Sequence, residues 1–568
     1  MRDPFILRIR IIYILIFSFG ILILGRLFFV QVLNSHVYRE EANQQYFVSP
    51  AQYFDRGTIF LKDKDGQLIS AATLKKGFLL AINPTILEKP ENAYEKISQI
   101  IPLDKDLFFK CAGKKDDIYE EVSSKISQSD KEKIEALGIK GVNLYSQNWR
   151  YYPASNLASR VLGFAGFNEN VIEGRYGLEK YYESILNKAS GDFSLNNPFA
   201  EIIINFKKLI SSIPEKGDVV TTIEPEVQIL LEKSLKDLLE KYSSEMAGGL
   251  VMDPQTGRII AMSVKPDFDP NRYNEEKISL FSNPIVQSVF EMGSIMKPLT
   301  LAAAMNEGAI TPQTTYEDKG YVIFNNKRIE NYDGKGRGVV NMQEVLNNSL
   351  NTGAVFAMEK LGKEKFKDYI INYGLGEKTG IDLPDEIQGL ISNLDSNRDV
   401  EYATASFGQG IAVTPIEMIS ALASLANGGI LVKPFIVEEI KNDQGFSRKI
   451  EPETRRQVLS QQTSKEISRM LSNVVDNALL GGTVKLERYT IAAKTGTAQY
   501  KAEGEAGYRE GEYIHTFFGY APAFNARFIT FLFLVRPQGA RYASNSLTEP
   551  FMDITKFLLN YYEVPPDR

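Results

Sequence analysis

The sequence predicts an α+β protein with one N-terminal transmembrane helix, a mixed α/β domain, and a larger domain built on an antiparallel sheet. Three observations lead to this prediction: an apolar run at residues 11–33, a charged and irregular stretch at 34–215, and strand patterns at both ends of residues 216–568 with helical patterns between them. At 568 residues the chain is too long for one hydrophobic core, so at least two domains are expected.

The apolar run at residues 11–33 is long enough to cross a membrane, which takes about 20 residues. Arg26 is its one charged residue. Three arginines precede the run, so we expect residues 1–10 to be cytoplasmic and the rest of the chain to lie outside the cytoplasmic membrane. A cleavable signal peptide is the alternative. No small-x-small cleavage site follows the run, which favours an uncleaved signal anchor.

Residues 34–215 mix short strands, charged helices and loops. Residues 122–137 are rich in Ser, Lys, Glu and Ile, and this composition predicts a solvated surface helix. Short strands and turns are expected at residues 150–153 and 163–167. No second catalytic centre is expected in this region.

The larger domain, residues 216–568, begins with strand patterns at 219–223, 248–252 and 258–264. Turn residues at 253–257 join the last two of these strands, which predicts a β-hairpin. Later strand patterns are found at residues 491–499, 515–520 and 527–535. Helical patterns are found at residues 226–242, 299–306, 342–361, 415–427, 464–478 and 553–561. Strands at both ends with helices between them predict an antiparallel sheet flanked by helices.

The composition excludes several classes of function. The net charge is −6 and no large basic block is present, so nucleic acid is not an expected partner. The single cysteine, Cys111, excludes an intrachain disulfide and a cysteine-based zinc site, and two histidines argue against a histidine-rich metal site. A Ser-His-Asp triad on His515 is not favoured, because the chain lacks a Gly-x-Ser-x-Gly elbow. We therefore expect no metal and no cofactor.

Ser294 and Lys297 form a Ser-x-x-Lys motif just before an apolar, Ala-rich run that is predicted to be a helix. A spacing of three places both side chains on one helical face. A serine hydroxyl becomes a good nucleophile when a base removes its proton, and a lysine can be that base when burial or nearby charge lowers its pKa. Chance would give roughly two such matches in a chain of this length, so a helix cap and a solvated lysine are the alternatives for an isolated motif.

Two more matches follow in a fixed order. Ser349-Leu-Asn351 lies in a stretch rich in capping residues, and Lys-Thr-Gly-Thr at residues 494–497 ends an apolar run. Ser-x-x-Lys, then Ser-x-Asn, then Lys-Thr-Gly is the signature of serine enzymes that act on penicillin-like acyl groups. The ordered set is far more specific than any of its tripeptides.

With these motifs the chain resembles a class B penicillin-binding protein, a monofunctional peptidoglycan D,D-transpeptidase. The resemblance covers roughly residues 20–560. It includes further stretches at residues 56–59, 176–179, 249–257, 405–410 and 518–522. Departures from the family's pattern occur at Met292, Leu350 and Ala493, and none of them removes a chemical group. The resemblance implies a pedestal of the dimerisation-domain type at residues 34–215 and a penicillin-binding transpeptidase domain at 216–568, whose five-stranded antiparallel sheet is β-lactamase-like.

The resemblance also implies roles for the first two motifs. Ser294 is the expected nucleophile and Lys297 its base. Ser349 is expected to relay a proton towards the leaving amine. Asn351 is expected to hold the Lys297 ammonium or a substrate amide through its carbonyl and NH2 groups.

The third motif is expected on an edge strand beside the cleft. Lys494, Thr495 and Thr497 would bind the terminal carboxylate of the substrate. Gly496 lacks a side chain and would let the substrate backbone approach closely. In the family the oxyanion hole consists of two backbone N–H groups, which correspond here to those of Ser294 and Thr497.

These features predict a D,D-transpeptidase that cross-links peptidoglycan through a serine acyl-enzyme on stem peptides ending in D-Ala-D-Ala and that is inhibited by β-lactams. Septal division is favoured over elongation. The expected location is the cytoplasmic membrane, with one span and the catalytic domain outside. A polytopic glycan polymerase and other division or elongation proteins are the expected partners. The alternatives are a D,D-carboxypeptidase, a β-lactamase-like hydrolase and a β-lactam-binding scaffold.

Overall fold

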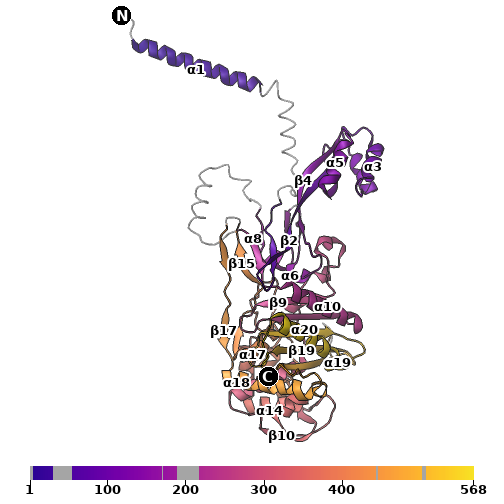
Figure 1. Cartoon of the computed structure of the whole chain (residues 1–568), viewed down its shortest axis with the longest axis vertical. Helices are drawn as coiled ribbons and strands as arrows, with labels where there is room; N and C mark the ends of the chain where they lie inside the picture. Colours follow the sequence, from indigo (N-terminus) through magenta and orange to yellow (C-terminus); the bar gives the residue numbers. More distant parts are fainter. Residues whose placement is uncertain (1–3, 30–53, 169–170, 189–215, 443–444, 502–506) are drawn as a thin grey trace. The chain divides into compact units, whose positions relative to one another are not determined.

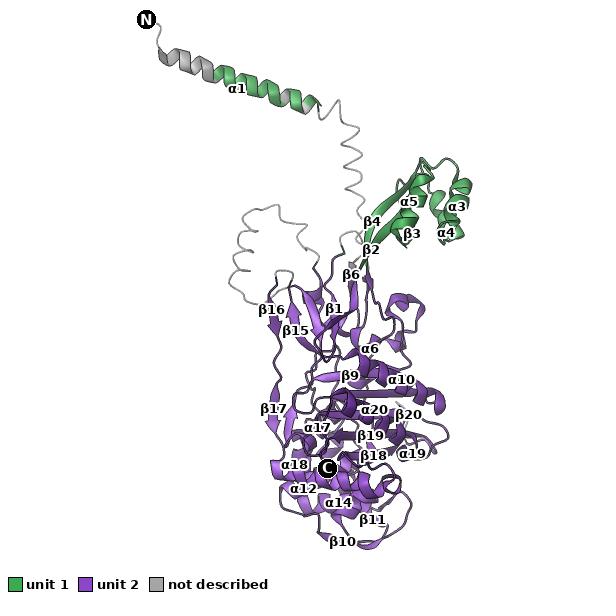
Figure 2. Cartoon of the chain, in the orientation of Figure 1, with its two compact units in different colours: residues 1–54, 75–149 green, residues 55–74, 150–568 purple. Residues whose placement is uncertain are grey.

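The computed structural model describes the following parts of the chain (Figure 1): residues 4–29, 54–168, 171–188, 216–442, 445–501 and 507–568. The chain divides into two compact units, one of residues 1–54 with 75–149 and one of residues 55–74 with 150–568 (Figure 2). The boundary predicted between residues 215 and 216 lies at the edge of an undescribed stretch and stays a prediction.

The N-terminal helix α1 runs from Pro4 to Phe28 and includes most of the predicted transmembrane segment. Residues 30–33 of that segment lie outside the described residues. Within the described part of the chain, no helix combines the length and the apolarity that crossing a membrane requires. The transmembrane segment is therefore not confirmed by the structure.

The smaller unit contains a compact α/β core. Strand β3 (Glu120–Ile126) pairs antiparallel with the end of β2 (Leu68–Ile82), and helix α5 (Gln128–Ala136) follows β3. The prediction of one helix over residues 122–137 is thus wrong in its first third. Val122 and Ile126 face the core of the unit, and strand pairing stabilises a segment whose composition suits a helix equally well. The other elements are α3 (Pro90–Ser98), α4 (Lys105–Ala112) and β4 (Val142–Tyr151).

In the larger unit, a mixed sheet joins segments from both predicted domains. Strand β1 (Ile59–Lys62) pairs antiparallel with the start of β2 and parallel with β7 (Asp218–Thr221). Strand β15 (Val437–Lys441) pairs antiparallel with β7, and β16 (Ser447–Lys449) lies beyond it. These strands are far apart in the sequence, so their pairing ties residues 59–72 to the rest of the larger unit.

A buried ionic cluster connects two of the stretches that carry the family resemblance. Arg56 Nε and Arg150 Nε each donate to a carboxylate oxygen of Glu179 at 2.5 Å, and Tyr152 donates to the same carboxylate at 3.0 Å. Burial alone would raise the pKa of the Glu179 carboxyl, but the two guanidinium charges outweigh it and lower that pKa. The cluster therefore has a structural role.

The central sheet of the larger unit has five strands in the order β18-β19-β20-β8-β9, and every pairing is antiparallel. Its strands are β18 (Ala492–Gln499), β19 (Tyr513–Ala521), β20 (Phe528–Val535), β8 (Met246–Met252) and β9 (Ile259–Lys265). The predicted hairpin is formed by β8 and β9, and its turn is closed by a hydrogen bond from Gly257 N to Asp253 O at 2.9 Å. The predicted position of the Lys-Thr-Gly strand at an edge of the sheet agrees with the structure, where β18 is an outermost strand.

Helices cover both faces of this sheet, which explains why β20 is almost wholly apolar. Along β20, Leu532 packs with α10 (Pro225–Lys241) and α20 (Thr548–Tyr561), while Phe531 and Phe533 face the opposite core. That opposite core contains α12 (Lys297–Asn306), α17 (Pro415–Ala426) and α18 (Gln461–Asn473). The functional motifs lie where α12 meets β18.

Candidate active site

A large groove in the larger unit brings the three sequence motifs together. Its volume is about 2210 Å³. The motif residues in its lining are Ser294, Ser349, Asn351, Lys494, Thr495 and Thr497. Edge strand β18 forms one wall of the groove. The three predicted motifs therefore form one site.

Ser294 lies in a short 3₁₀ turn (Gly293–Met296) that leads directly into α12. Gly293 has a φ of +62°, and its N–H donates to Gly408 O at 3.0 Å. A Cβ on Gly293 would lie 3.0 Å from the carbonyl carbon of Thr497. The turn is thus held between β18 and the segment at Gly408, with Ser294 partly exposed to the groove. The two predicted oxyanion-hole residues, Ser294 and Thr497, belong to segments in direct contact.

Lys297 is fully buried below the groove. Its Nζ donates to the carbonyl oxygen of Ser349 at 2.5 Å and to the Ser349 Oγ at 3.2 Å. Burial, and then the charge of Lys494, place the pKa of Lys297 well below its ordinary value. A lowered pKa favours the neutral amine, which is the form that can accept a proton from a serine hydroxyl.

Ser349 occupies the break between α13 (Met342–Asn347) and α14 (Asn351–Leu361), so the pattern at 342–361 forms two helices. Its φ is +53°, a left-handed conformation that costs a non-glycine residue about 1–3 kcal/mol. The Ser349 Oγ accepts hydrogen bonds from Lys297 at 3.2 Å and from Lys494 at 3.1 Å. The strained backbone thereby places one hydroxyl between the two lysines.

Asn351 does not make the expected contact with Lys297. Its side-chain Nδ2 donates to Glu330 O at 2.8 Å, and its backbone N–H donates to Asn331 Oδ1 at 2.9 Å. No hydrogen bond joins Asn351 to Lys297 in the described part of the chain. The alternative role, binding a substrate amide, stays a prediction, since Asn351 lines the groove.

On β18 the motif residues alternate between the two faces of the strand. Lys494 is 4% exposed and lies on the inner side, whereas Thr495 and Thr497 are half-buried on the other. Burial lowers the pKa of Lys494 to about 8. The Thr497 hydroxyl accepts from Ala543 N at 3.1 Å, at the start of α19 (Ala543–Ser546).

The structure offers a second explanation for the glycine at position 496, besides the predicted approach of the substrate. A Cβ at this position would lie 2.3 Å from Thr516 Oγ1 and 2.7 Å from Met292 O. Both atoms belong to the protein, and Met292 directly precedes the turn that carries Ser294. The absence of a side chain therefore lets β18 pack against the nucleophile's turn, and making room for the substrate is not needed to explain it.

His515 does not contribute to the groove. It is fully buried on β19, its Nδ1 lies 2.8 Å from Ser546 Oγ, and burial lowers its pKa to about 4. This position agrees with the sequence-based preference for a serine–lysine centre.

Sequence reasoning missed two groove residues, Glu291 and Tyr508. Both line the groove, and Tyr508 donates a hydrogen bond to the Glu291 carboxylate. Glu291 is three residues before Ser294, so its closeness to the nucleophile could have been noticed. Tyr508 is more than two hundred residues away in the sequence, and no local pattern predicts its contact.

Comparisons with known proteins support this geometry. Residues 247–556 match the penicillin binding protein transpeptidase domain, and residues 52–194 match the penicillin-binding protein dimerisation domain. Stage V sporulation protein D of Bacillus subtilis (strain 168) is 31% identical over 96% of this chain and 84% of its own length. Peptidoglycan D,D-transpeptidase FtsI of Buchnera aphidicola subsp. Schizaphis graminum is 25% identical over 97% of this chain and 94% of its own.

Two solved structures share the fold. Penicillin binding protein 2X from Streptococcus thermophilus superposes with a TM-score of 0.72 at 21% identity, covering 90% of this chain and 80% of that one. Penicillin binding protein 3 from Mycobacterium tuberculosis, complexed with aztreonam, superposes with a TM-score of 0.68 at 22% identity, covering 91% and 98%.

Proposed function

Because this chain belongs to the penicillin-binding transpeptidase family, we propose that it is a serine-type D,D-transpeptidase that cross-links peptidoglycan. The observation that carries the proposal is the arrangement around Ser349. One hydroxyl accepts hydrogen bonds from a fully buried lysine of the Ser-x-x-Lys motif and from the lysine of the Lys-Thr-Gly motif. This geometry connects the nucleophile's base, Lys297, to the hydroxyl that would pass a proton to the leaving amine.

The first half-reaction forms an acyl-enzyme. Neutral Lys297 takes the hydroxyl proton of Ser294, and the Ser294 Oγ attacks the carbonyl carbon of the penultimate D-Ala of the donor stem. The N–H groups of Ser294 and Thr497 stabilise the negative oxygen of the tetrahedral intermediate. The intermediate collapses by breaking the peptide bond, and the proton passes from Lys297 through Ser349 to the nitrogen of the departing D-Ala.

The second half-reaction transfers the acyl group. A neutral amine of a neighbouring stem attacks the ester carbonyl, and a new amide bond replaces the bond to Ser294. The Ser294 Oγ regains a proton from Lys297, which receives one from the attacking nitrogen, so no net proton is gained or lost by the enzyme. A β-lactam acylates Ser294 by the first half-reaction alone.

Lys494 supplies the charge that orients the donor. Lys494, Thr495 and Thr497 all line the groove, and an ammonium and two hydroxyls there are suited to the terminal carboxylate of a D-Ala-D-Ala stem or the carboxylate of a penicillin. Asn351 also lines the groove and would bind a substrate amide.

The proposal includes a membrane anchor. The apolar residues 11–33 would cross the cytoplasmic membrane once, with residues 1–10 inside and the catalytic domain outside. Arg26 would face a partner helix rather than lipid, and the proposed partner is a polytopic glycan polymerase. A septal role is proposed, with elongation as the alternative, because several relatives bear the name FtsI. A fluorescent fusion found along the side wall instead of the septum would contradict it.

A fluorescent penicillin tests the nucleophile. Full-length protein in detergent should be labelled covalently, and Ser294→Ala should abolish the label. Ser288→Ala, which changes another groove-lining serine, should keep it. Covalent labelling of Ser294→Ala would refute the assignment. Product analysis of a D-Ala-D-Ala donor with and without an acceptor amine distinguishes a transpeptidase, which forms the cross-linked amide, from a carboxypeptidase, which forms only the hydrolysed stem.

A further inference from the structure

Glu291 is a groove-lining carboxylate whose position is fixed by neighbours on two other segments. The Tyr508 hydroxyl lies 3.0 Å from each of its oxygens, and Gly410 N donates to Oε1 at 3.2 Å. A second hydrogen bond, from Gly293 N to Gly408 O, also joins the segment that carries Glu291 to the segment that carries Gly410. Glu291 is therefore held in place at the groove, three residues before Ser294 in the sequence.

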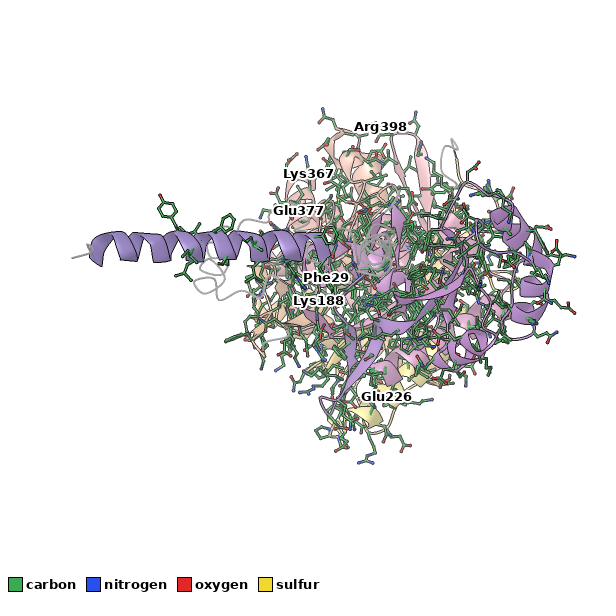
Figure 3. The ribbon with its side chains drawn as sticks, turned by 90° about the horizontal axis from the view of Figure 1, so that it is seen from above. Phe29, Lys188, Glu226, Lys367, Glu377 and Arg398 are labelled. Carbon is green, nitrogen blue, oxygen red and sulfur yellow. The ribbon has the colours of Figure 1, made fainter. Side chains whose placement is uncertain are left out.

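Other carboxylates in the groove are already neutralised or satisfied. Glu245, Glu330 and Glu401 each have an arginine within ion-pair distance, which is 3.2 Å for Glu401 and Arg398. Arg398 lies at the molecular surface (Figure 3). Glu344 accepts amides from its own helical turn. Among the described residues no lysine or arginine comes within 4.0 Å of the Glu291 carboxylate.

This environment favours a cationic ligand. Burial raises the pKa of the Glu291 carboxyl, and the hydrogen bonds from Tyr508 and Gly410 and the more distant charge of Lys501 only partly oppose that shift. A positive charge supplied by a ligand would stabilise the ionised carboxylate, which burial disfavours. Lys494 offers the opposite sign in the same groove, so the groove suits a ligand with both a carboxylate and a cation.

We propose that Glu291, held by Tyr508, binds a side-chain ammonium group of a stem peptide in the groove. The inference rests on the proposed function, in which each stem of the polymer carries an amine that can become the acceptor. An ammonium would donate a charge-assisted hydrogen bond to the carboxylate, in a position where the described residues supply no cation within 4.0 Å. Glu291 then acts as a specificity residue, because it binds substrate without exchanging protons with the reacting bond.

The ammonium has two possible sources, and they affect different steps. If it belongs to the donor stem, Glu291 promotes acylation of Ser294. If it belongs to the acceptor stem, Glu291 binds that stem in the groove, the ammonium then loses a proton to water to give the neutral nucleophile, and Glu291 promotes only the transfer of the acyl group. Both sources present the same chemical group to the same carboxylate.

The test uses full-length protein in detergent and synthetic stem peptides whose side-chain amine is free or acetylated. The donor arm measures kcat/KM for release of D-Ala in the absence of an acceptor. The acceptor arm measures the ratio of cross-linked to hydrolysed product from an acetylated donor as free-amine acceptor is increased. Variants are Glu291→Gln and, as the matched control, Glu330→Gln, which changes a groove carboxylate that has its own arginine, Arg328.

Loss of the charge-assisted hydrogen bond in Glu291→Gln is expected to cause a roughly tenfold drop in one of two quantities. These are the kcat/KM advantage of the free-amine donor over the acetylated donor, and the ratio of cross-linked to hydrolysed product at a given acceptor concentration. This decrease should appear in only one of the two arms, and that arm identifies whether the ammonium belongs to the donor or to the acceptor stem. Glu330→Gln should behave as wild type in both arms. The proposal is wrong if Glu291→Gln matches wild type in both arms. In the donor arm this means the same preference for the free-amine over the acetylated donor, and in the acceptor arm the same ratio of cross-linked to hydrolysed product at each acceptor concentration.

Acylation by benzylpenicillin, which has no ammonium, controls for folding and should be unchanged in Glu291→Gln. If that variant fails to fold, Tyr508→Phe replaces it, and an unaltered preference there likewise overturns the proposal. Failure of the proposed function has a different signature. A wild-type protein that releases D-Ala but never forms a cross-link is a carboxypeptidase, and the donor arm still decides whether Glu291 binds the ammonium.

Discussion

Replacing Gly496 with alanine separates two explanations of the glycine in the Lys-Thr-Gly motif. The sequence suggested that the missing side chain makes room for a substrate. In the structure, a Cβ at this position would lie 2.3 Å from Thr516 Oγ1 and 2.7 Å from Met292 O. Since real Cβ contacts are essentially never that short, β18 and the turn before Ser294 would have to move apart.

Two effects are expected to lower the free energy of unfolding of Gly496→Ala. An extra methyl group in a well-packed interior costs about 1–3 kcal/mol. The methyl would also disturb the hydrogen bond from Thr516 Oγ1 to Met292 O, which is 2.9 Å long and of a kind worth roughly 1 kcal/mol. We expect Gly496→Ala to lower the free energy of unfolding by roughly 2–4 kcal/mol. Because Met292 is two residues before Ser294, acylation by penicillin should slow as well.

Thermal unfolding without any ligand and the rate of acylation by penicillin are the two measurements. Gly507→Ala is the matched control, because a Cβ there meets nothing within 4 Å and the residue also lines the groove. The packing explanation requires Gly496→Ala to unfold at a lower temperature than both wild type and the control. Wild-type unfolding together with slow acylation would refute it and restore the explanation based on substrate approach.

Three further predictions concern charge and proton transfer. The Lys494 ammonium loses its proton as the pH rises through about 8, so KM for a carboxylate-bearing donor should rise above that pH, and Lys494→Arg should remove this rise. Ser349→Ala should slow acylation by penicillin by roughly 10²–10⁴-fold, the range of a lost proton relay, with little change in unfolding temperature; an unchanged rate would exclude the relay. Glu179→Gln leaves two buried guanidinium groups without their shared carboxylate and should cost about 3–5 kcal/mol in thermal unfolding. Glu183→Gln, whose side chain is 30% exposed, should cost clearly less, and equal losses would contradict the role given to burial.

Patterns that depend on local sequence were predictable. The apolar run at residues 527–535 is covered by helices on both faces, and strands so buried are apolar at nearly every position. The turn at 253–257 closes the predicted hairpin, because its Asp, Thr and Gly satisfy the backbone locally. Ser294 and Lys297 were predictable for the same reason, since a spacing of three fixes their relative position on a helical turn.

Errors arose where contacts distant in sequence decide the outcome. Residues 122–126 form a strand because β2 offers them a partner, and that pairing is invisible in their composition. The side chain of Asn351 turns to Glu330 and its backbone to Asn331, so it does not reach Lys297. The close approach of Gly496 to the carbonyl of Met292, some two hundred residues earlier, was equally invisible in the sequence, and the predicted role of Gly496 in substrate approach stays a prediction.

The position of β18 at the edge of the sheet has a consequence for the evolution of inhibitor resistance. An outermost strand presents backbone N–H and C=O groups to any extended chain laid alongside it, and these groups are the same whatever side chains the strand carries. A peptide or an antibiotic bound in this way is recognised by backbone geometry. Point substitutions that leave the backbone unmoved therefore change this component of binding little. Variants that discriminate against an antibiotic must shift the strand or alter the residues around it, such as those that hold the turn at Gly293.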